Sequence, residues 1–297
     1  MRVAITGSSG LIGTALRQSL HSDGHEVLRL VRRPPVASDE VAWDPAQGEL
    51  ASTALAGIDA AVNLAGTGFG DRRWTESYKR SITDSRLDST GLLARVLAEV
   101  GPTVLVSASA VGYYGNAGDD PLTEDSPPAD DFAAQVCVRW EAATAPAEEA
   151  GVRVAHIRSG LVMSGAGGLL KRLLLPFKWG LGGRIGSGRQ YWSWIDIEDE
   201  VAAIRHLLER DDLAGPFNLT APRPLAFDDV RRVVSRVLRR PAVLPVPNFA
   251  IRTLFGTERA DNIILGGQRV LPQRLEESGF GFRFTDFEAS LRHQIDR

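Results

Sequence analysis

Residues 2–31 read RVAITGSSGLIGTALRQSLHSDGHEVLRLV. A short β-rich run, residues 2–6, leads into a glycine-rich turn at 7–13, and apolar residues then recur at helical spacing as far as Leu20. Gly24 ends this helix, and residues 26–31 form a second strand. A strand, a glycine-rich turn, a helix and a strand within about thirty residues make a glycine pattern a hypothesis of dinucleotide binding.

The turn has the spacing G-x-x-G-x-x-G, and each glycine has its own task. Gly7 permits the tight turn, and Gly10 lets the backbone approach a pyrophosphate without a Cβ in the way. Gly13 lets the helix pack close to the sheet. The helix N-terminus presents unpaired N–H groups and a positive dipole end to the phosphates. A plain glycine-rich loop is the alternative, and the flanking strand and helix argue against it.

The end of the second strand indicates which dinucleotide is bound. An NAD site usually has an acidic residue there to bind the ribose hydroxyls. This chain has Arg32 and Arg33, nineteen and twenty residues after Gly13. An arginine binds a 2′-phosphate with charge-assisted, often bidentate, hydrogen bonds. The sequence therefore predicts NADP(H), unless the two arginines merely end the strand.

The rest of the chain alternates strands and helices. We expect strands at 41–44, 58–64, 104–108, 152–157 and 217–220, and helices at 75–100 and 133–150. This order is typical of the α/β class: a Rossmann-type, doubly wound parallel sheet with a smaller, mainly helical C-terminal substrate lobe. The expected core is residues 1–163, with 191–220 returning to it, and 164–190 and 221–297 form the substrate side. Asp44, after the third strand, either bonds the adenine amino group or belongs to a turn.

Composition excludes several classes of protein. The 297 residues are 43% hydrophobic and 24% charged, which is ordinary for a globular protein and rules out disorder and a disulfide scaffold. Cys137 is the one cysteine, which fits a reducing cytoplasm. No apolar run is long enough to span a membrane, and the N-terminus has no signal-peptide pattern. A basic, amphipathic stretch at 230–240 is interpreted as a solvated helix face rather than a nucleic-acid patch.

Several longer blocks carry a resemblance to a known family. The chain resembles an atypical extended short-chain dehydrogenase/reductase of the epimerase/dehydratase-like subfamily (short-chain dehydrogenase family 39U type, with its C-terminal epimerase-associated domain). The matching blocks span nearly the whole chain: TGSSGLIG at 6–13, NLAG at 63–66, RRWTESYKRSITDSR at 72–86, SASAVGYYG at 107–115, WEAA at 140–143, RSGLVMSGAGG at 158–168, PFKWGLGGRIGSGRQYWSWI at 176–195 and GQRVLPQRLEESGF at 267–280.

The resemblance implies roles for residues in these blocks. It places the pyrophosphate against the turn and the 2′-phosphate against Arg32 and Arg33. Arg86 is expected to point toward the cofactor, and Leu161 to pack near the nicotinamide. The full set of expected cofactor-binding residues is Gly7, Ser9, Gly10, Leu11, Ile12, Gly13, Arg32, Arg33, Leu64, Ala65, Gly66, Arg86, Ser107 and Leu161.

The chain departs from the superfamily where its chemistry normally lies. Ordinary members use a tyrosine as general acid/base, and a lysine four residues later on the same helix face. Aligning Glu141 with the acid usually found one turn later places Ala133 at the tyrosine position and Cys137 at the lysine position. Neither side chain can perform that chemistry. Cys137 is either a reactive thiol or an inert buried one.

Other residues are candidates to replace the missing pair. Ser109 matches the superfamily's serine, and Tyr113 and Tyr114 follow the same strand, where they either act as the general acid or pack in a turn. Such a tyrosine needs a neighbouring charge, for which Arg158 and Lys79 are candidates. The five histidines lack metal-ligand spacing, so we expect no metal.

Two functions remain open from the sequence. The first is an NADP-dependent oxidoreductase or epimerase acting on a small polar molecule, with Arg184 and Arg189 either binding an anionic substrate or facing solvent. The second is a non-catalytic NADP(H)-binding redox sensor or partner-binding protein. The expected partner is a small-molecule substrate, and a homodimer is left open. Neither nucleic acid nor a membrane is expected as a partner.

Overall fold

The computed structural model describes residues 1–101 and 104–296, which divide into two compact units. The first unit consists of Met1–Ser109, Val136–Ile157 and Val201–Pro216, and the second of Ala110–Gln135, Arg158–Glu200 and Phe217–Arg297. These boundaries differ from the domains expected from the sequence, because segments 110–135 and 158–163 belong to the second unit. Strand β6 (Pro121–Leu122) pairs there with β13 (Arg269–Val270), and β8 (Leu161–Met163) pairs with β10 (Trp194–Asp196).

The first strand, helix and second strand form as the sequence predicts. Strand β1 (Arg2–Thr6) leads into helix α1 (Leu11–Ser22), and Gly24, with a φ of 77°, reverses the chain into β2 (Glu26–Val31). Strands β1 and β2 pair in parallel from Arg2 opposite Glu26 to Thr6 opposite Leu30. The carboxyl ends of both strands therefore lie side by side. The glycine turn follows the end of β1 there, and Arg32 follows the end of β2.

The central sheet confirms the predicted fold class. It has seven strands in the order β11-β7-β5-β4-β1-β2-β3, and the pairings on both sides of β1 are parallel. The chain moves outward from β1 to β3 and then crosses to β4 on the other side, as in doubly wound sheets. The remaining strands are β3 (Glu40–Ala42), β4 (Ala60–Asn63), β5 (Val104–Ala110), β7 (Arg153–Ser159) and β11 (Gly215–Leu219).

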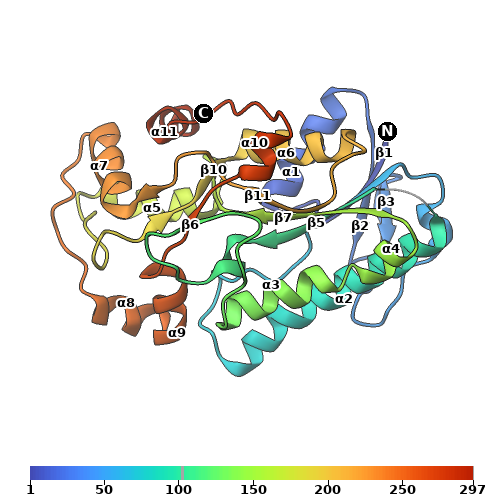
Figure 1. Ribbon diagram of the computed structural model, residues 1–297, viewed down its shortest axis with the longest axis horizontal. Helices are drawn as coiled ribbons and strands as arrows, with labels where there is room; N and C mark the ends of the chain where they lie inside the picture. The colour runs from blue at the N-terminus through green and yellow to red at the C-terminus, as the bar shows by residue number, and fades with distance from the viewer. Residues whose placement is uncertain (102–103, 297) are drawn as a thin grey trace. The chain divides into compact units, whose positions relative to one another are not determined.

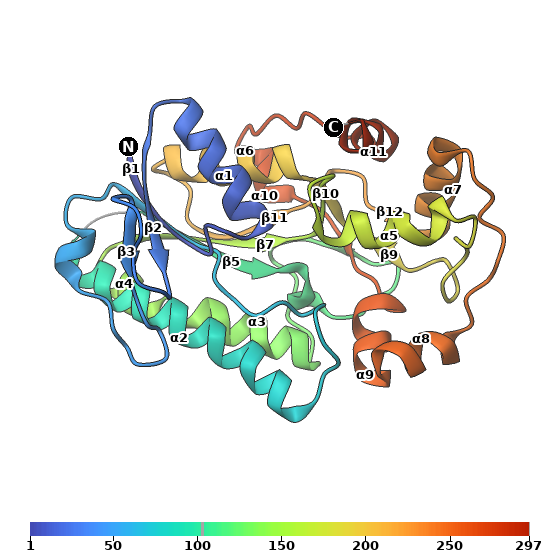
Figure 2. The ribbon, with the colours of Figure 1, turned by 180° about the vertical axis from the view of Figure 1, so that it is seen from behind.

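Helices cover both faces of this sheet. Helices α1 and α6 lie on one face and α2, α3 and α4 on the other, in both views of the ribbon (Figure 1; Figure 2). The bounds are α2 Glu76–Val100, α3 Phe132–Ala142, α4 Ala145–Glu149 and α6 Ile197–Glu209, with a 3-10 turn at Ser52–Leu55. The single helix expected at 133–150 is two helices, because Pro146 starts a new one and has no N–H to continue the first.

The first unit has an aliphatic core beneath these helices. Side chains from β2, β4 and β5 pack against α2 and α4, and all are at most about 5% exposed. Representative members are Leu28, Leu30, Leu55, Leu93, Leu97 and Leu105. Burial of this kind, at about 25 cal/mol per Å² of apolar surface, holds the strand ends in a fixed arrangement.

The second unit has short strands and several helices around its own core. Strand β9 (Tyr191–Trp192) pairs antiparallel with β12 (Leu225–Ala226). Trp194 and Phe227 are fully buried in the core beneath α5, α7 and α11. The remaining elements are α5 Gly168–Lys178, α7 Phe227–Leu238, α8 Asn248–Phe255, α9 Thr257–Arg259, α10 Gln273–Glu277 and α11 Phe287–Ile295, with a 3-10 turn at Val111–Tyr114 and a π-helical turn at Ala260–Ile264.

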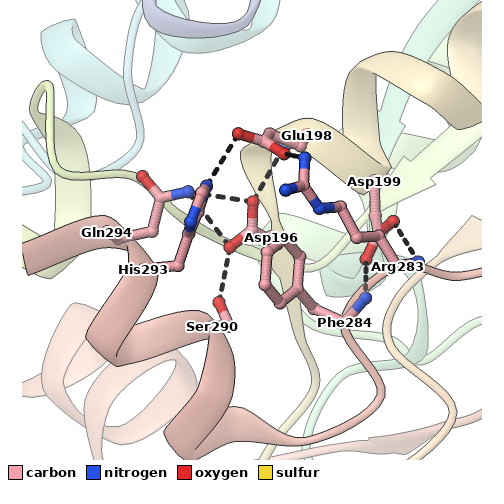
Figure 3. A network of polar contacts seen from close by, with 8 residues as sticks. All are labelled: Asp196, Glu198, Asp199, Arg283, Phe284, Ser290, His293 and Gln294. Atoms are coloured by element: carbon pink, nitrogen blue, oxygen red, sulfur yellow. Dashed lines mark hydrogen bonds and ion pairs between the residues drawn. The ribbon is translucent and has the colours of Figure 1, made fainter. Parts of the chain in front are cut away.

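A buried carboxylate fastens the C-terminal helix to the end of β10 (Figure 3). Asp196 is fully buried, and it accepts hydrogen bonds from Ser290 Oγ at 2.6 Å and from Gln294 Nε2 at 3.0 Å. Burial raises the pKa of Asp196, and these hydrogen bonds oppose that rise. Asp199 accepts the backbone N–H groups of Arg283 at 2.8 Å and Phe284 at 2.9 Å. The segment 283–294 is therefore bound at both of its ends.

We expect Asp196→Ala to destabilise the protein by about 2–4 kcal/mol, because Ser290 and Gln294 would each be left as a buried donor without an acceptor. Urea unfolding measures the change. The control is Asp296→Ala, an exposed carboxylate just after the same helix, which should change stability by less than about 0.5 kcal/mol. Equal effects of the two variants would show that the buried bonds contribute nothing.

Candidate functional site

The glycine turn is a close contact between three backbone segments. A Cβ on Gly13 would lie 2.3 Å from the Gly7 carbonyl oxygen, and a Cβ on Gly7 would lie 2.6 Å from the Leu64 carbonyl oxygen. Gly7 also has a φ of 65°, which side-chain-bearing residues rarely adopt. Gly10 begins α1 without a side-chain cap. The first N–H groups of the helix therefore face outward as an anion site.

A threonine and an asparagine hold the 63–65 segment over this turn. Thr6 Oγ1 donates to Asn63 Oδ1 at 2.7 Å and accepts the backbone N–H groups of Leu64 at 3.0 Å and Ala65 at 3.2 Å. Asn63 Nδ2 donates in turn to Thr90 Oγ1 at 2.7 Å. All three polar side chains are buried, so they build the site from inside.

Ser107 belongs to the same internal network. Its side chain is fully buried, and its Oγ lies 3.4 Å from Asn63 Nδ2. The role that the sequence suggested for Ser107, direct contact with a cofactor, stays a prediction. Thr6 and Asn63 begin two of the blocks that carry the family resemblance, TGSSGLIG and NLAG, but the sequence indicated no role for either or for Thr90. A polar residue ending each of two neighbouring parallel strands was a usable signal.

A cavity of about 900 Å³ opens in the first unit above the turn. Its lining includes seven of the residues expected to bind the cofactor: Gly7, Ser9, Gly10, Arg32, Arg33, Ala65 and Gly66. Leu11, Ile12, Gly13, Leu64, Arg86 and Ser107 are not part of this lining, and Leu161 lies in the second unit. Residues that the sequence did not indicate as lining are Ser8, Arg29, Leu30, Val31, Trp43, Pro45, Ala46, Thr67, Ser81, Asp84, Ser85, Asp88 and Ser89.

The two arginines at the end of β2 differ in their surroundings. Arg32 is exposed, and within the described residues no hydrogen bond or ion pair engages it. Arg33 makes a two-pronged ion pair with the buried carboxylate of Glu40, with Nη1 at 2.8 Å and Nη2 at 2.6 Å. These bonds lower the pKa of Glu40 to about 2. Of the two arginines, only Arg33 therefore already has a carboxylate paired with its charge.

Arg86 is buried beside the cavity rather than lining it. Its guanidinium lies between the rings of Phe69 and Trp140, 4.4 Å and 4.6 Å from their centroids. Its Nη1 donates to the carbonyl oxygens of Thr67 at 2.8 Å and Ile82 at 3.0 Å. Burial lowers the pKa of Arg86 to about 10. Arg86 thus ties the 66–69 segment to α2 and supports the cavity wall.

The helix that usually carries tyrosine and lysine is packed inward here. Ala133 and Cys137 of α3 are 8% and 0% exposed. Ser109, at the end of β5, donates from Oγ to Glu141 Oε1 at 2.6 Å. The hydroxyl proton of Ser109 is therefore directed at a carboxylate on α3, a partner that the sequence did not indicate.

Tyr113 and Tyr114 lie in the second unit with Arg158 but in different surroundings. Tyr114 is 3% exposed, donates to Asn218 Oδ1 at 2.7 Å and accepts from Arg158 Nη1 at 2.9 Å. Burial raises the pKa of Tyr114 to about 12. Tyr113 is half-buried, and Arg158 Cζ lies 3.5 Å from its ring centroid. Lys79, the other candidate charge, lies 3.7 Å from Glu76.

Comparison with known proteins assigns the family. The NAD dependent epimerase/dehydratase family matches residues 3–220, and a domain of unknown function, DUF1731, matches 246–294. The chain belongs to the epimerase/dehydratase family. Epimerase family protein Mb2239 of Mycobacterium bovis is 45% identical over 295 residues, 99% of this chain and 98% of that protein. Human epimerase family protein SDR39U1 is 37% identical over 300 residues, 99% of this chain and all of that protein.

Two solved structures of family members share the fold. The crystal structure of human SDR39U1 with NADPH has a TM-score of 0.91 and 35% identity, and the alignment covers 100% of this chain and 99% of the human one. A nucleoside-diphosphate sugar epimerase from Corynebacterium glutamicum has a TM-score of 0.83 and 39% identity, and it covers 99% of this chain and 58% of its own.

Two features are absent from residues 1–101 and 104–296: a metal-binding group of side chains and a membrane-spanning helix. No group of three or more histidine, cysteine or carboxylate side chains is arranged to hold a metal ion. No helix in these ranges is both long and apolar enough to cross a membrane.

A buried acid beneath the Ser159 strand end gives this region a pH dependence. Glu200 is fully buried, accepts from Ser159 Oγ at 2.6 Å, and has no partner for Oε2 among the described residues. Burial raises the pKa of Glu200 from 4.5 to about 8. The folded state thus keeps this proton where the unfolded chain loses it, so the group's contribution to stability falls as pH rises from about 4.5 to about 8.

We expect Glu200→Gln to gain stability relative to the wild type as pH rises through that window, with the difference constant above and below it. Thermal unfolding of both proteins between pH 4.5 and 9 measures the difference. Glu209→Gln changes an exposed carboxyl group on the same helix and is the matched control. A Glu200→Gln difference that does not vary with pH would contradict the assignment.

Proposed function

We propose that the cavity of the first unit binds NADP(H). The observation that carries the proposal is the unpaired guanidinium of Arg32 at the cavity rim, where an NAD site would have an acid. The uncapped N-terminus of α1 supplies N–H donors for the pyrophosphate, and the 64–66 segment offers small side chains for close approach. The NADPH in the human relative's structure supports the same cofactor.

We expect Arg32→Ala to weaken NADPH binding by about tenfold or more, the loss expected for a charge-assisted contact with phosphate. NADH, which has no 2′-phosphate, should bind within about twofold of the wild type. Titration of protein fluorescence with each nucleotide measures both constants. Arg95→Ala removes an exposed arginine of α2 outside the cavity and should change neither. Equal weakening of NADPH and NADH would refute the phosphate contact.

We further propose that the protein is an oxidoreductase or epimerase acting on a small polar molecule. Bound NADPH supplies a hydride to a carbonyl carbon, and the carbonyl oxygen then needs a proton from the protein. Tyr113 is the better donor of the two tyrosines, because it is half-buried and Arg158 places a positive charge over its ring. The hydroxyl of Tyr114 already has two partners.

Ser109 fits an orienting role in this chemistry. Because its proton is directed at Glu141, its oxygen is free to accept a hydrogen bond from a substrate hydroxyl. A small molecule that carries hydroxyl groups next to a carbonyl, such as a sugar, meets both requirements. A sugar nucleotide is suggested by analogy with relatives of this fold.

One observation favours a second function, NADP(H) sensing without turnover. Ala133 and Cys137 are buried and pack α3 against its neighbours, so the usual acid/base pair is absent and its face of the helix is used for packing. A protein that binds the cofactor and changes its interactions accordingly would need only the first unit's cavity.

Turnover of deuterium-labelled cofactor separates the two functions. Protein is incubated with [4-²H]NADPH and a metabolite extract, and products are analysed by mass spectrometry. We expect deuterium in one metabolite class, at least about 100-fold less with Tyr113→Phe, and little change with Tyr114→Phe. Tight NADPH binding without labelled product would rule out net hydride transfer and leave two functions, the sensor and an epimerase that returns the hydride to the same molecule. Equal losses in the two variants would contradict the role of Tyr113.

A further inference from the structure

Four alternating charges form a compact group where β2 leaves the sheet. Arg29 Nε lies 2.6 Å from Asp39 Oδ2, and its Nη1 lies 3.0 Å from Glu40 Oε1. Arg33 Nη1 and Nη2 approach both oxygens of Glu40 at 2.8 Å and 2.6 Å. Two guanidinium groups and two carboxylates therefore cancel, and this group adds no net charge to the cavity wall.

Glu40 is the centre of this group. Its side chain is 1% exposed, and besides the two arginines it accepts the backbone N–H of Val36 at 2.8 Å. A buried carboxylate with this many donors stays ionised, consistent with a pKa of about 2. Glu40 also begins β3, so it connects this strand to Arg33 and Val36 of the 32–39 segment. It thereby fixes the backbone that carries Arg32.

The buried anion would oppose a phosphate if it were not matched. A 2′-phosphate bound at Arg32 carries about −1.5 to −2 charge near neutral pH, as phosphate monoesters do. A carboxylate left without its counter-charge would repel that negative charge. The bond between Arg33 and Glu40 removes this repulsion, and it uses both terminal nitrogens of Arg33.

We propose that Glu40 is a positioning residue for NADP(H) selectivity, that Arg33 acts as its counter-charge rather than as a phosphate ligand, and that Arg32 contacts the phosphate. This inference rests on the proposed binding of NADP(H). The expectation that Arg32 and Arg33 face the phosphate together is revised, because Arg33 is already paired with Glu40 while Arg32 has no hydrogen-bond or ion-pair partner among the described residues. Glu40 belongs to none of the dinucleotide-binding motifs described above.

A double-mutant cycle tests the inference. We measure dissociation constants for NADPH and NADH with the full-length wild type, Arg33→Ala, Glu40→Gln and the double variant, and repeat them at two salt concentrations. Arg33→Ala should weaken NADPH binding by about tenfold, because the remaining Arg29, Asp39 and Glu40 carry a net charge of −1. The double variant should return to within about threefold of the wild type, since neither charge remains. NADH binding should vary by less than about twofold throughout.

Three other results of these binding measurements would each contradict one part of the proposal. A double variant as weak as Arg33→Ala would show that Arg33 itself contacts the phosphate. A parallel loss of NADH binding in Glu40→Gln would show that Glu40 maintains the fold of the segment and has no role in selectivity. A wild type that binds NADPH no better than NADH would refute the proposed cofactor, whatever the cycle gives. Circular dichroism of each variant confirms folding before the comparison.

Discussion

The site depends on a contact between backbones that leaves no room for a side chain. Gly13 of α1 lies against the carbonyl of Gly7, and Gly7 lies against the carbonyl of Leu64. This contact sets how closely α1 approaches the carboxyl ends of β1 and β4. The uncapped helix terminus can face a ligand only because that approach is close. A methyl group at either glycine would move a whole helix rather than a side chain, because the opposing atoms are backbone.

The polar groups follow from this constraint. Once α1 and the 63–65 segment are brought together over β1, the backbone N–H groups of Leu64 and Ala65 need partners out of water. The Thr6 hydroxyl provides them by accepting two and donating to Asn63. Asn63 passes the connection to Thr90 on α2. Strands β1 and β4 and helix α2 are thus linked through buried side chains.

The sequence predicted the first secondary-structure elements well, but it did not predict which distant residues form hydrogen bonds or ion pairs with the site residues. Periodicity and turn residues located β1, α1 and β2, because each signal lies within about thirty residues, and the alternation of strands and helices indicated a doubly wound parallel sheet. Arg32 and Arg33 looked equivalent, because nothing local shows that Glu40, seven residues later, is buried and bonded to one of them. Tyr113 and Tyr114 were inseparable for the same reason, since Asn218 and Arg158 are distant in sequence. Long-range burial decides which of two neighbouring residues is available.

The loss of the usual tyrosine and lysine is easier to understand from the packing of α3. Trp140 donates from Nε1 to Thr90 at 2.9 Å and offers a ring face to Arg86. Arg86 in turn holds the carbonyl of Thr67 in the cavity wall. Small buried side chains at 133 and 137 let this helix pack tightly against the first unit's interior, where a lysine would have to bury a second cation near Arg86.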